Sequence, residues 1–152
     1  VDDYGGGVCQ VSTTLYVAML KAGLKIQERY AHGLPVTYVP LGLDATVSYD
    51  YLDMKMKNAD DAPFVLAIYA IDGVLTAKVY GQDPGDFRIE VESSILKEIP
   101  AEPVTADPTK PGDELPRLRP GFLVETRVKH YRGDTLLKTE RLNTSMYPPE
   151  KP

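Results

Sequence analysis

Apolar residues recur at helical spacing near the start of the chain. After the glycine run Gly5-Gly6-Gly7 they stand three or four positions apart, which is the pattern of a helix with one buried face. Gly23 follows, and glycine ends many helices because it adopts the left-handed conformation at little cost. The pattern therefore predicts one buried helix. The apolar residues that form its predicted face are Val8, Val11, Leu15, Ala18, Met19 and Ala22.

Most of the remaining chain alternates between apolar and polar residues, which predicts strands. The first predicted strand turns Leu24, Ile26 and Tyr30 toward the helix. His32 has the same parity and is expected to point the same way, with Glu28 the one charged exception. The predicted strands are Leu24–His32, Ala45–Tyr49, Leu52–Lys57, Phe64–Ile71, Val74–Tyr80, Arg88–Glu92, Phe122–Tyr131 and Thr135–Asn143.

Two turns and a proline-rich stretch divide the chain. Asp72-Gly73 and Arg132-Gly133-Asp134 each separate two predicted strands, which is typical of hairpin turns. Prolines between Pro100 and Pro120 recur every few residues and predict an extended connector. The expected fold class is α+β, with one buried N-terminal helix packed on an antiparallel sheet, followed by a proline-rich linker and a β-hairpin module. The expected domains are residues 1–83, a strand and linker at 84–121, and a hairpin module at 122–152 that the chain truncates.

Composition narrows the classes of function. The net charge of −5 and a pI near 5.0 argue against a nucleic-acid partner. No apolar run reaches the roughly 18 residues of a membrane span. The chain begins at Val1 without an export signal, so we expect it to be a piece of a longer protein with any signal or anchor upstream. One cysteine and two histidines leave little material for a metal centre, and we expect neither metal nor cofactor.

Cys9 is the candidate nucleophile. It stands at the start of the predicted helix, where unpaired N–H groups favour a thiolate and could hold an oxyanion on an attacked carbonyl. The alternative is a structural cysteine, since free cysteines are often buried. The helix also carries the supporting candidates Gln10, Ser12, Thr13 and Tyr16.

His32 is the candidate base. An antiparallel return of its strand would bring it back toward Cys9, and a thiol paired with an imidazole is a common activated nucleophile. Asp44 is the first candidate to orient the imidazole, although its parity places it on the polar side of its strand. Asp53 and Glu28 are the alternatives. An inward histidine bonded to the backbone would explain the same pattern without catalysis.

A series of motifs covers about the first eighty residues. Residues 5–16 read GGGVCQVSTTLY, and further motifs follow at 32–40, 42–47 and 52–58. Together they resemble the VanW-like family, which commonly has serine where this chain has Gly33. The resemblance implies a vancomycin resistance-associated protein on the extracellular face of the envelope of Gram-positive-type bacteria. The C-terminal part is similar to a small extracellular five-glycine β-module, on the strength of Gly112, Gly121 and Gly133.

Two functions remain open from the sequence. The order Cys9, His32, Asp44 is similar to that of transglutaminase-like and papain-like enzymes. In the leading hypothesis Cys9 attacks an amide of a peptidoglycan peptide, His32 transfers the proton and Asp44 holds the imidazole tautomer. The substrate and partner, peptidoglycan or a cell-wall peptide, follow from the family's location. The alternative is a non-catalytic envelope module that binds peptidoglycan or glycan.

Overall fold

The computed structural model describes residues 6–59, 61–104 and 116–152. In this part of the chain one helix and seven strands are formed, and all strand pairs are antiparallel. The elements are α1 (Val8–Lys21), β1 (Lys25–Glu28), β2 (Lys55–Lys57), β3 (Val65–Ile71), β4 (Val74–Tyr80), β5 (Phe87–Ile99), β6 (Gly121–Arg132) and β7 (Thr135–Tyr147). The protein is thus a mixed fold, mostly of strands, with one helix in the described part.

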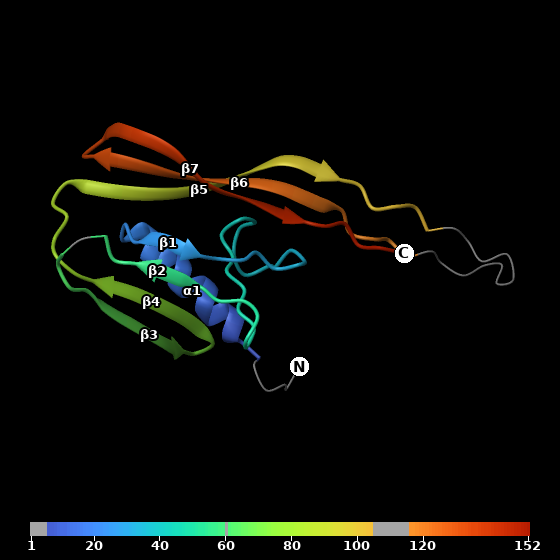
Figure 1. Ribbon diagram of the computed structural model, residues 1–152, viewed down its shortest axis with the longest axis horizontal. Helices are drawn as coiled ribbons and strands as arrows, with labels where there is room; N and C mark the ends of the chain where they lie inside the picture. Colours follow the sequence, from blue (N-terminus) through green and yellow to red (C-terminus); the bar gives the residue numbers. More distant parts are fainter. Residues whose placement is uncertain (1–5, 60, 105–115) are drawn as a thin grey trace, which may run out of the picture.

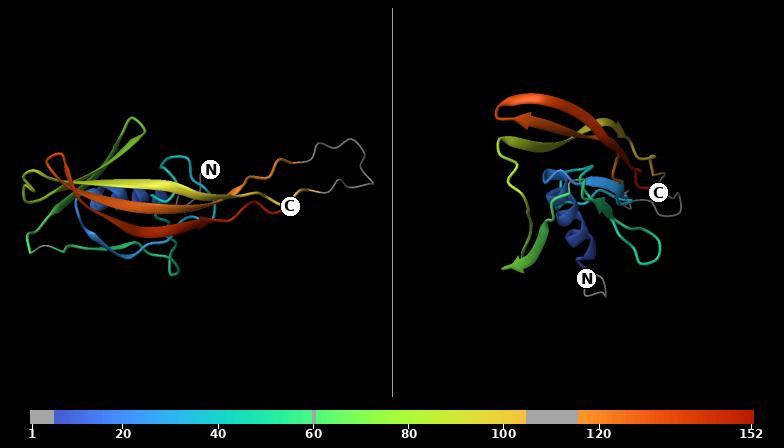
Figure 2. Two further views of the ribbon diagram at one scale, coloured as in Figure 1. Left: turned by 90° about the horizontal axis from the view of Figure 1, so that it is seen from above. Right: turned by 60° about the vertical axis from the view of Figure 1, so that its left-hand side comes forward.

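The strands form three separate sheets arranged around α1. The pairs β1–β2 and β3–β4 are two-stranded, and β5–β6–β7 is a long three-stranded sheet. Figure 1 shows this long sheet above, α1 with β1 and β2 beneath it, and the β3–β4 hairpin at the lower left. The two further views in Figure 2 place α1 under the same sheet. No helix in the described ranges has the length and hydropathy of a membrane span.

Helix α1 begins and ends at glycines, as predicted. Gly7 and Gly23 both have positive φ, and the N–H of Leu24 donates to the carbonyl of Met19 across the helix end. The buried face, however, differs from the predicted one. Val8 is 50% exposed, whereas the buried residues are Ser12, Thr13, Tyr16, Met19 and Leu20. This partly polar stripe is buried because the hydroxyls of Ser12 and Thr13 donate hydrogen bonds to the backbone carbonyl of Ala45, in the segment that lies against the helix.

The strand after α1 is shorter than predicted and changes face. β1 has an irregular register between Ile26 and Glu28, and beyond it only a single bridge joins Tyr30 to Thr46. An extra residue in a strand turns the following side chains to the other face. The prediction that Tyr30 points inward is therefore wrong, because Tyr30 is 42% exposed while Arg29 is turned inward.

The other strands follow the predicted order with different lengths. The β3–β4 hairpin is confirmed, with Asp72 and Gly73 both at positive φ as its turn requires. The predicted strand Ala45–Tyr49 is reduced to two isolated bridges, and β2 covers only the end of Leu52–Lys57. β5 is much longer than Arg88–Glu92. Gly5, Gly112 and residues 105–115 of the predicted linker lie outside the described residues.

The long C-terminal sheet packs on the N-terminal part of the chain. Val124, Thr126 and Tyr147 are at most 1% exposed, although most of the hairpin side chains are in contact with solvent. The Tyr147 hydroxyl accepts a hydrogen bond from the N–H of Gly42 at 2.7 Å, and Thr126 donates to the Gly42 carbonyl at 3.0 Å. Residues of the predicted hairpin module thus complete the core around the segment 42–45.

Replacing Gly42 by alanine is expected to lower the free energy of unfolding by about 2–4 kcal/mol. Gly42 has a φ of +86°, and a Cβ there would lie 2.7 Å from Thr126 Oγ1 and 2.9 Å from Val124 Cγ1. Gly133 is the matched control, since its φ is also positive but a Cβ would meet nothing within 4 Å. Urea denaturation checks the difference. Equal losses for Gly42→Ala and Gly133→Ala would contradict the close packing.

Candidate functional site

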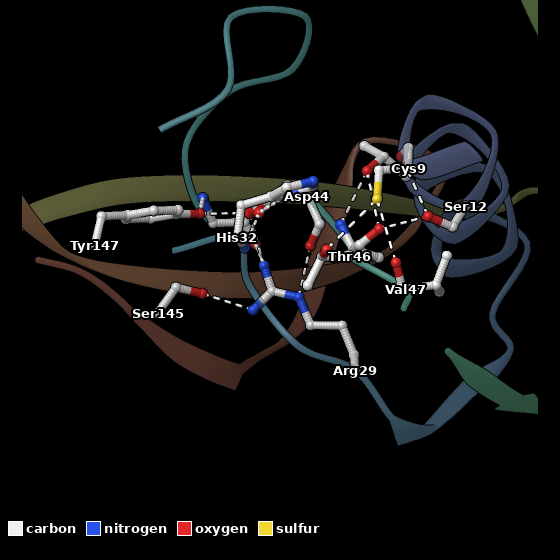
Figure 3. Close-up of polar contacts among 12 residues, drawn as sticks. Cys9, Ser12, Arg29, His32, Asp44, Thr46, Val47, Ser145 and Tyr147 are labelled. Atoms are coloured by element: carbon white, nitrogen blue, oxygen red, sulfur yellow. Dashed lines mark hydrogen bonds and ion pairs between the residues drawn. The ribbon is translucent and has the colours of Figure 1, made fainter. Parts of the chain in front are cut away.

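Asp44 is the centre of a buried polar network (Figure 3). Its side chain is fully buried, and every hydrogen bond it makes is one that it accepts. Oδ2 lies 2.7 Å from both the backbone nitrogen and Nδ1 of His32. Oδ1 accepts from Arg29 Nη2 at 2.9 Å and from the Tyr147 hydroxyl. The carboxylate therefore holds His32 with one oxygen and is anchored by the other.

The ionisation of Asp44 determines how His32 is held. Burial alone would raise the pKa of Asp44, but hydrogen bonds from His32 and Tyr147 and the charge of Arg29 outweigh it and lower the pKa. The carboxylate is therefore ionised at neutral pH and can only accept hydrogen bonds. His32 Nδ1 consequently carries a proton, and this N–H donates a hydrogen bond to Asp44 Oδ2. In the neutral imidazole this leaves Nε2 as the atom that can accept a proton.

Arg29 is the cation of the network, and its side chain is only 5% exposed. Besides Asp44 Oδ1 it donates to the Asp44 carbonyl at 2.6 Å and to the Gly42 carbonyl at 3.2 Å. A fourth hydrogen bond, 2.6 Å long, reaches the hydroxyl of Ser145 on β7. The guanidinium also lies over the ring of Tyr16, 5.6 Å from its centroid. Arg29 thus joins the segment 42–45 to both α1 and the C-terminal sheet.

Cys9 lies in the first turn of α1 and is partly exposed. Its sulfur is 3.5 Å from both Thr46 Oγ1 and the Val47 carbonyl. His32 is not among its hydrogen-bond partners in the described part of the chain. The two residues nevertheless contact the same short segment, residues 44–47. His32 bonds to Asp44, and Cys9 bonds to Thr46 and Val47 (Figure 3). The N-cap residue of α1 is Gly7, which has no side chain to bond to the first N–H groups of the helix.

A surface cleft of about 900 Å³ opens beside Cys9. Glu28, Asp50, Asp53 and Lys55 line it together with Val8 and the rest of the segment 47–52. Lys55 forms ion pairs with Glu28 and, at 3.4 Å, with Asp53. The two alternative orienting carboxylates are therefore engaged with a lysine, whereas Asp44 holds the imidazole. Cys9 thus lines a cleft that carries side chains of both charges.

Tyr38 lies against both halves of the site. Its ring meets that of His32 edge-on, with centroids 6.4 Å apart and an interplanar angle of 85°. Burial raises the pKa of Tyr38, a hydrogen bond with Thr13 lowers it, and the nearby Cys9 and Asp44 raise it further. Tyr38 is still 42% exposed. Tyr38 is thus in contact with the imidazole and lies near Cys9 and Asp44.

The structure brings together most of the residues predicted from the sequence. His32 and Asp44 are hydrogen-bonded, and Ser12 and Thr13 tie α1 to the segment that carries Asp44. Gln10 is exposed, and Tyr16 packs under Arg29. Sequence reasoning missed Arg29, Tyr38, Ser145 and Tyr147. The alternation of side chains along the predicted strand Leu24–His32 indicates that Arg29 faces solvent. For Ser145 and Tyr147, no sequence pattern links β7 to the N-terminal segment.

Acid is expected to weaken the fold through Asp44. Because the pKa of Asp44 is lowered in the folded state from its ordinary value of 3.8, the unfolded chain binds the proton more readily. The stabilisation is present above about pH 4 and is lost as the pH falls below 3.8 toward the folded pKa. Urea denaturation at pH 7 and pH 3 measures the loss.

The control for this acid effect is Glu92→Gln, which removes an exposed carboxylate whose pKa is lowered by Lys129. Its acid loss should stay close to that of the wild type, because a solvent-exposed ion pair contributes little. A wild-type protein with equal stability at pH 7 and pH 3 would contradict the role of Asp44.

Comparisons with known proteins agree on one family for the N-terminal half. A family model described as "VanW like protein" matches residues 1–80. The chain is 40% identical over 102 residues to the uncharacterized protein YoaR of Bacillus subtilis (strain 168), covering 64% of this chain and 34% of that protein. It is 30% identical over 81 residues to the vancomycin B-type resistance protein VanW of Enterococcus faecalis (strain ATCC 700802 / V583). That match covers 50% of this chain and 30% of the relative.

The chain thus spans about a third of the length of the curated relatives that it matches. No solved structure matches it significantly. The segment that the family model matches contains α1 and the segment 42–45, while β5, β6 and β7 lie beyond it.

Proposed function

The chain belongs to the VanW-like protein family, and from that premise we propose that it is a cysteine-dependent enzyme that hydrolyses or transfers amide bonds of peptidoglycan peptides. The observation that carries the proposal is the pairing of His32 with a fully buried, ionised Asp44, on a segment that Cys9 also contacts at the edge of a cleft. Such an arrangement of thiol, imidazole and carboxylate is suited to acyl transfer. One relative is named as a vancomycin B-type resistance protein. On that association we assign the substrate class and the extracellular face of the bacterial envelope.

The proposed reaction begins at Cys9. Its sulfur attacks the carbonyl carbon of an amide, and a carbon–sulfur bond forms while the carbonyl oxygen gains negative charge. The N–H groups of Cys9 and Gln10 in the first turn of α1 stabilise this oxyanion. The carbon–nitrogen bond then breaks to leave a thioester on Cys9. Water or a second amine attacks the thioester, which restores the thiol and gives hydrolysis or transfer.

His32 carries the proton through these steps. Nε2 takes the proton of the thiol and returns it to the nitrogen of the leaving amine. Asp44 keeps Nδ1 protonated and stabilises the imidazolium that forms. Cys9 first has to leave the Thr46 hydroxyl and the Val47 carbonyl by rotating about its Cα–Cβ bond. Contacts between catalytic groups are often looser without substrate than with it.

One observation favours a second function, a non-catalytic module that binds peptidoglycan or glycan. The Cys9 thiol is bonded to Thr46 and Val47, and no hydrogen bond joins it to His32 in the residues described. In this alternative, Asp44, Arg29 and His32 form an internal network that fixes the fold, and the cleft binds its ligand unchanged.

Incubation of the protein with purified peptidoglycan stem peptides separates the two functions. The enzyme hypothesis predicts cleaved or transferred peptides in mass spectrometry, and an acyl adduct on the peptide that contains Cys9 after rapid acid quenching. Peptides that remain intact, with no adduct at any time point, would overturn it. If calorimetry then measures binding of the unchanged peptides, the binding module is the correct function.

A further inference from the structure

The candidate site receives support from a strand that lies far outside the family-matched segment. Tyr147 and Ser145 stand on β7, whereas the family match ends at residue 80. The two side chains are two positions apart, so they share a face of the strand. Both are buried, and both hydroxyls end in the Asp44 network. Strand β7 therefore contacts the site through two hydroxyl groups.

The Tyr147 hydroxyl has its hydrogen bonds fixed in direction. It accepts from the N–H of Gly42 at 2.7 Å and donates to Asp44 Oδ1. Burial and the bond to the Asp44 carboxylate raise the pKa of Tyr147 to about 12, so the hydroxyl keeps its proton at all ordinary pH values. A protonated donor therefore always faces Oδ1. This leaves Oδ2 to the two N–H groups of His32.

Ser145 acts on the same carboxylate through Arg29. Its hydroxyl accepts from Nη1 of Arg29 at 2.6 Å, while Nη2 of the same guanidinium donates to Asp44 Oδ1. Tyr147 and Arg29 thus hold one oxygen from two directions, which prevents the carboxylate from turning about its Cβ–Cγ bond. The plane of the carboxylate in turn sets the direction of the bond to His32 Nδ1.

We infer that Tyr147 is a positioning residue for the His32–Asp44 pair, with Ser145 as a second support through Arg29, so that strand β7 is part of the site. The expected effect on turnover rests on the proposed function, but the effect on the geometry of His32 can be measured whether or not the protein is an enzyme. A phenylalanine at position 147 would fill the same volume, so the hydroxyl, and not the packing of the ring, carries this role.

The experiment compares Tyr147→Phe and Ser145→Ala with Thr126→Val in the full chain. Thr126 is a matched control because it is fully buried, stands on the same sheet and also bonds to Gly42, but does not touch Asp44. The first readout is the set of ring-nitrogen signals of His32 in long-range ¹H–¹⁵N NMR spectra. The chain has only two histidines, so His130, which bonds to Glu140 on the exposed hairpin, is an internal reference.

We expect the His32 signals to shift in Tyr147→Phe, and to a smaller extent in Ser145→Ala, while they stay at their wild-type positions in Thr126→Val. His130 should not change in any of the three. With active protein, kcat for stem peptides should fall about 10–100-fold in Tyr147→Phe with KM within about twofold of the wild type.

Wild-type His32 signals in both Tyr147→Phe and Ser145→Ala would overturn the inference. If Tyr147→Phe does not fold, Ser145→Ala decides on its own. Shifted His32 signals in a protein whose wild type leaves stem peptides intact would uphold the positioning role and reject the proposed enzyme function.

Discussion

Replacing Asp44 by asparagine is expected to lower the free energy of unfolding by about 3–5 kcal/mol, the usual loss when one partner of a buried ion pair is removed. All four contacts of the Asp44 side chain are donors, from Arg29, Tyr147 and twice from His32. An amide in this position must turn its NH₂ group toward donors, whichever way it is flipped. Arg29 would also lose its counter-charge while its side chain stays 5% exposed. Chemical denaturation followed by circular dichroism measures the loss.

The control for this substitution is Asp53→Asn. Asp53 is 59% exposed and bonds to Lys55, so its replacement should change stability by no more than about 0.5 kcal/mol. If the two variants unfolded at the same denaturant concentration, Asp44 would not be the centre of a buried network.

The elements with strong local signals are the ones that the sequence predicts well. The helix has glycines at both ends, and the β3–β4 hairpin has an Asp-Gly turn that only two positive φ angles satisfy. Each of these signals acts within a few residues. The buried face of α1 is different, because it depends on what packs against the helix. Val8 and Val11 are 50% and 38% exposed, while the polar Ser12 is buried because its hydroxyl donates a hydrogen bond to the Ala45 carbonyl.

Parity arguments fail for the site at two places with separate causes. At Arg29 the register irregularity between Ile26 and Glu28 reverses the faces of the residues that follow, and a bulge leaves no clear mark in the sequence. At Asp44 the alternation of side chains along the predicted strand Ala45–Tyr49 indicates a solvent-facing position, on the assumption that only one face of the strand is buried. The segment is in fact covered on both sides, by Thr13 of α1 and by Tyr147 of β7. Tyr147 lies 103 residues from Asp44 in the sequence, and no local sequence pattern indicates a contact between residues so far apart.

The residue types of the site were more predictable than its geometry. Chemistry and order along the chain are enough to propose Cys9, at a helix start, and His32, after a return strand, as site residues. Their partners come from tertiary packing, as the bond from Cys9 to the Val47 carbonyl illustrates. A cysteine that bonds to a backbone carbonyl and yet opens onto a cleft is compatible with a nucleophile at rest and with a structural thiol. Its substitution separates the two.

Replacing Cys9 by alanine is expected to abolish turnover of stem peptides, by about 10⁴-fold or more, because no other described group at this position can form the thioester. The free energy of unfolding should fall by only about 1 kcal/mol, since the side chain is partly exposed and its hydrogen bonds are weak. Product analysis by mass spectrometry and thermal unfolding measure the two effects on the same sample.

His32→Ala and His130→Ala form the matched pair that tests how Cys9 is activated. His32→Ala should slow alkylation of the Cys9 thiol by iodoacetamide at neutral pH, because Nε2 of His32 is then no longer present to take the proton of the thiol. His130→Ala should leave the rate unchanged, since His130 lies on the exposed hairpin and bonds to Glu140. The structural alternative predicts the reverse for Cys9: its thiol is unreactive in the native protein, and Cys9→Ala lowers the melting temperature while binding of stem peptides persists. That combination would contradict a catalytic cysteine, because a nucleophilic thiol has to react with electrophiles in the native protein.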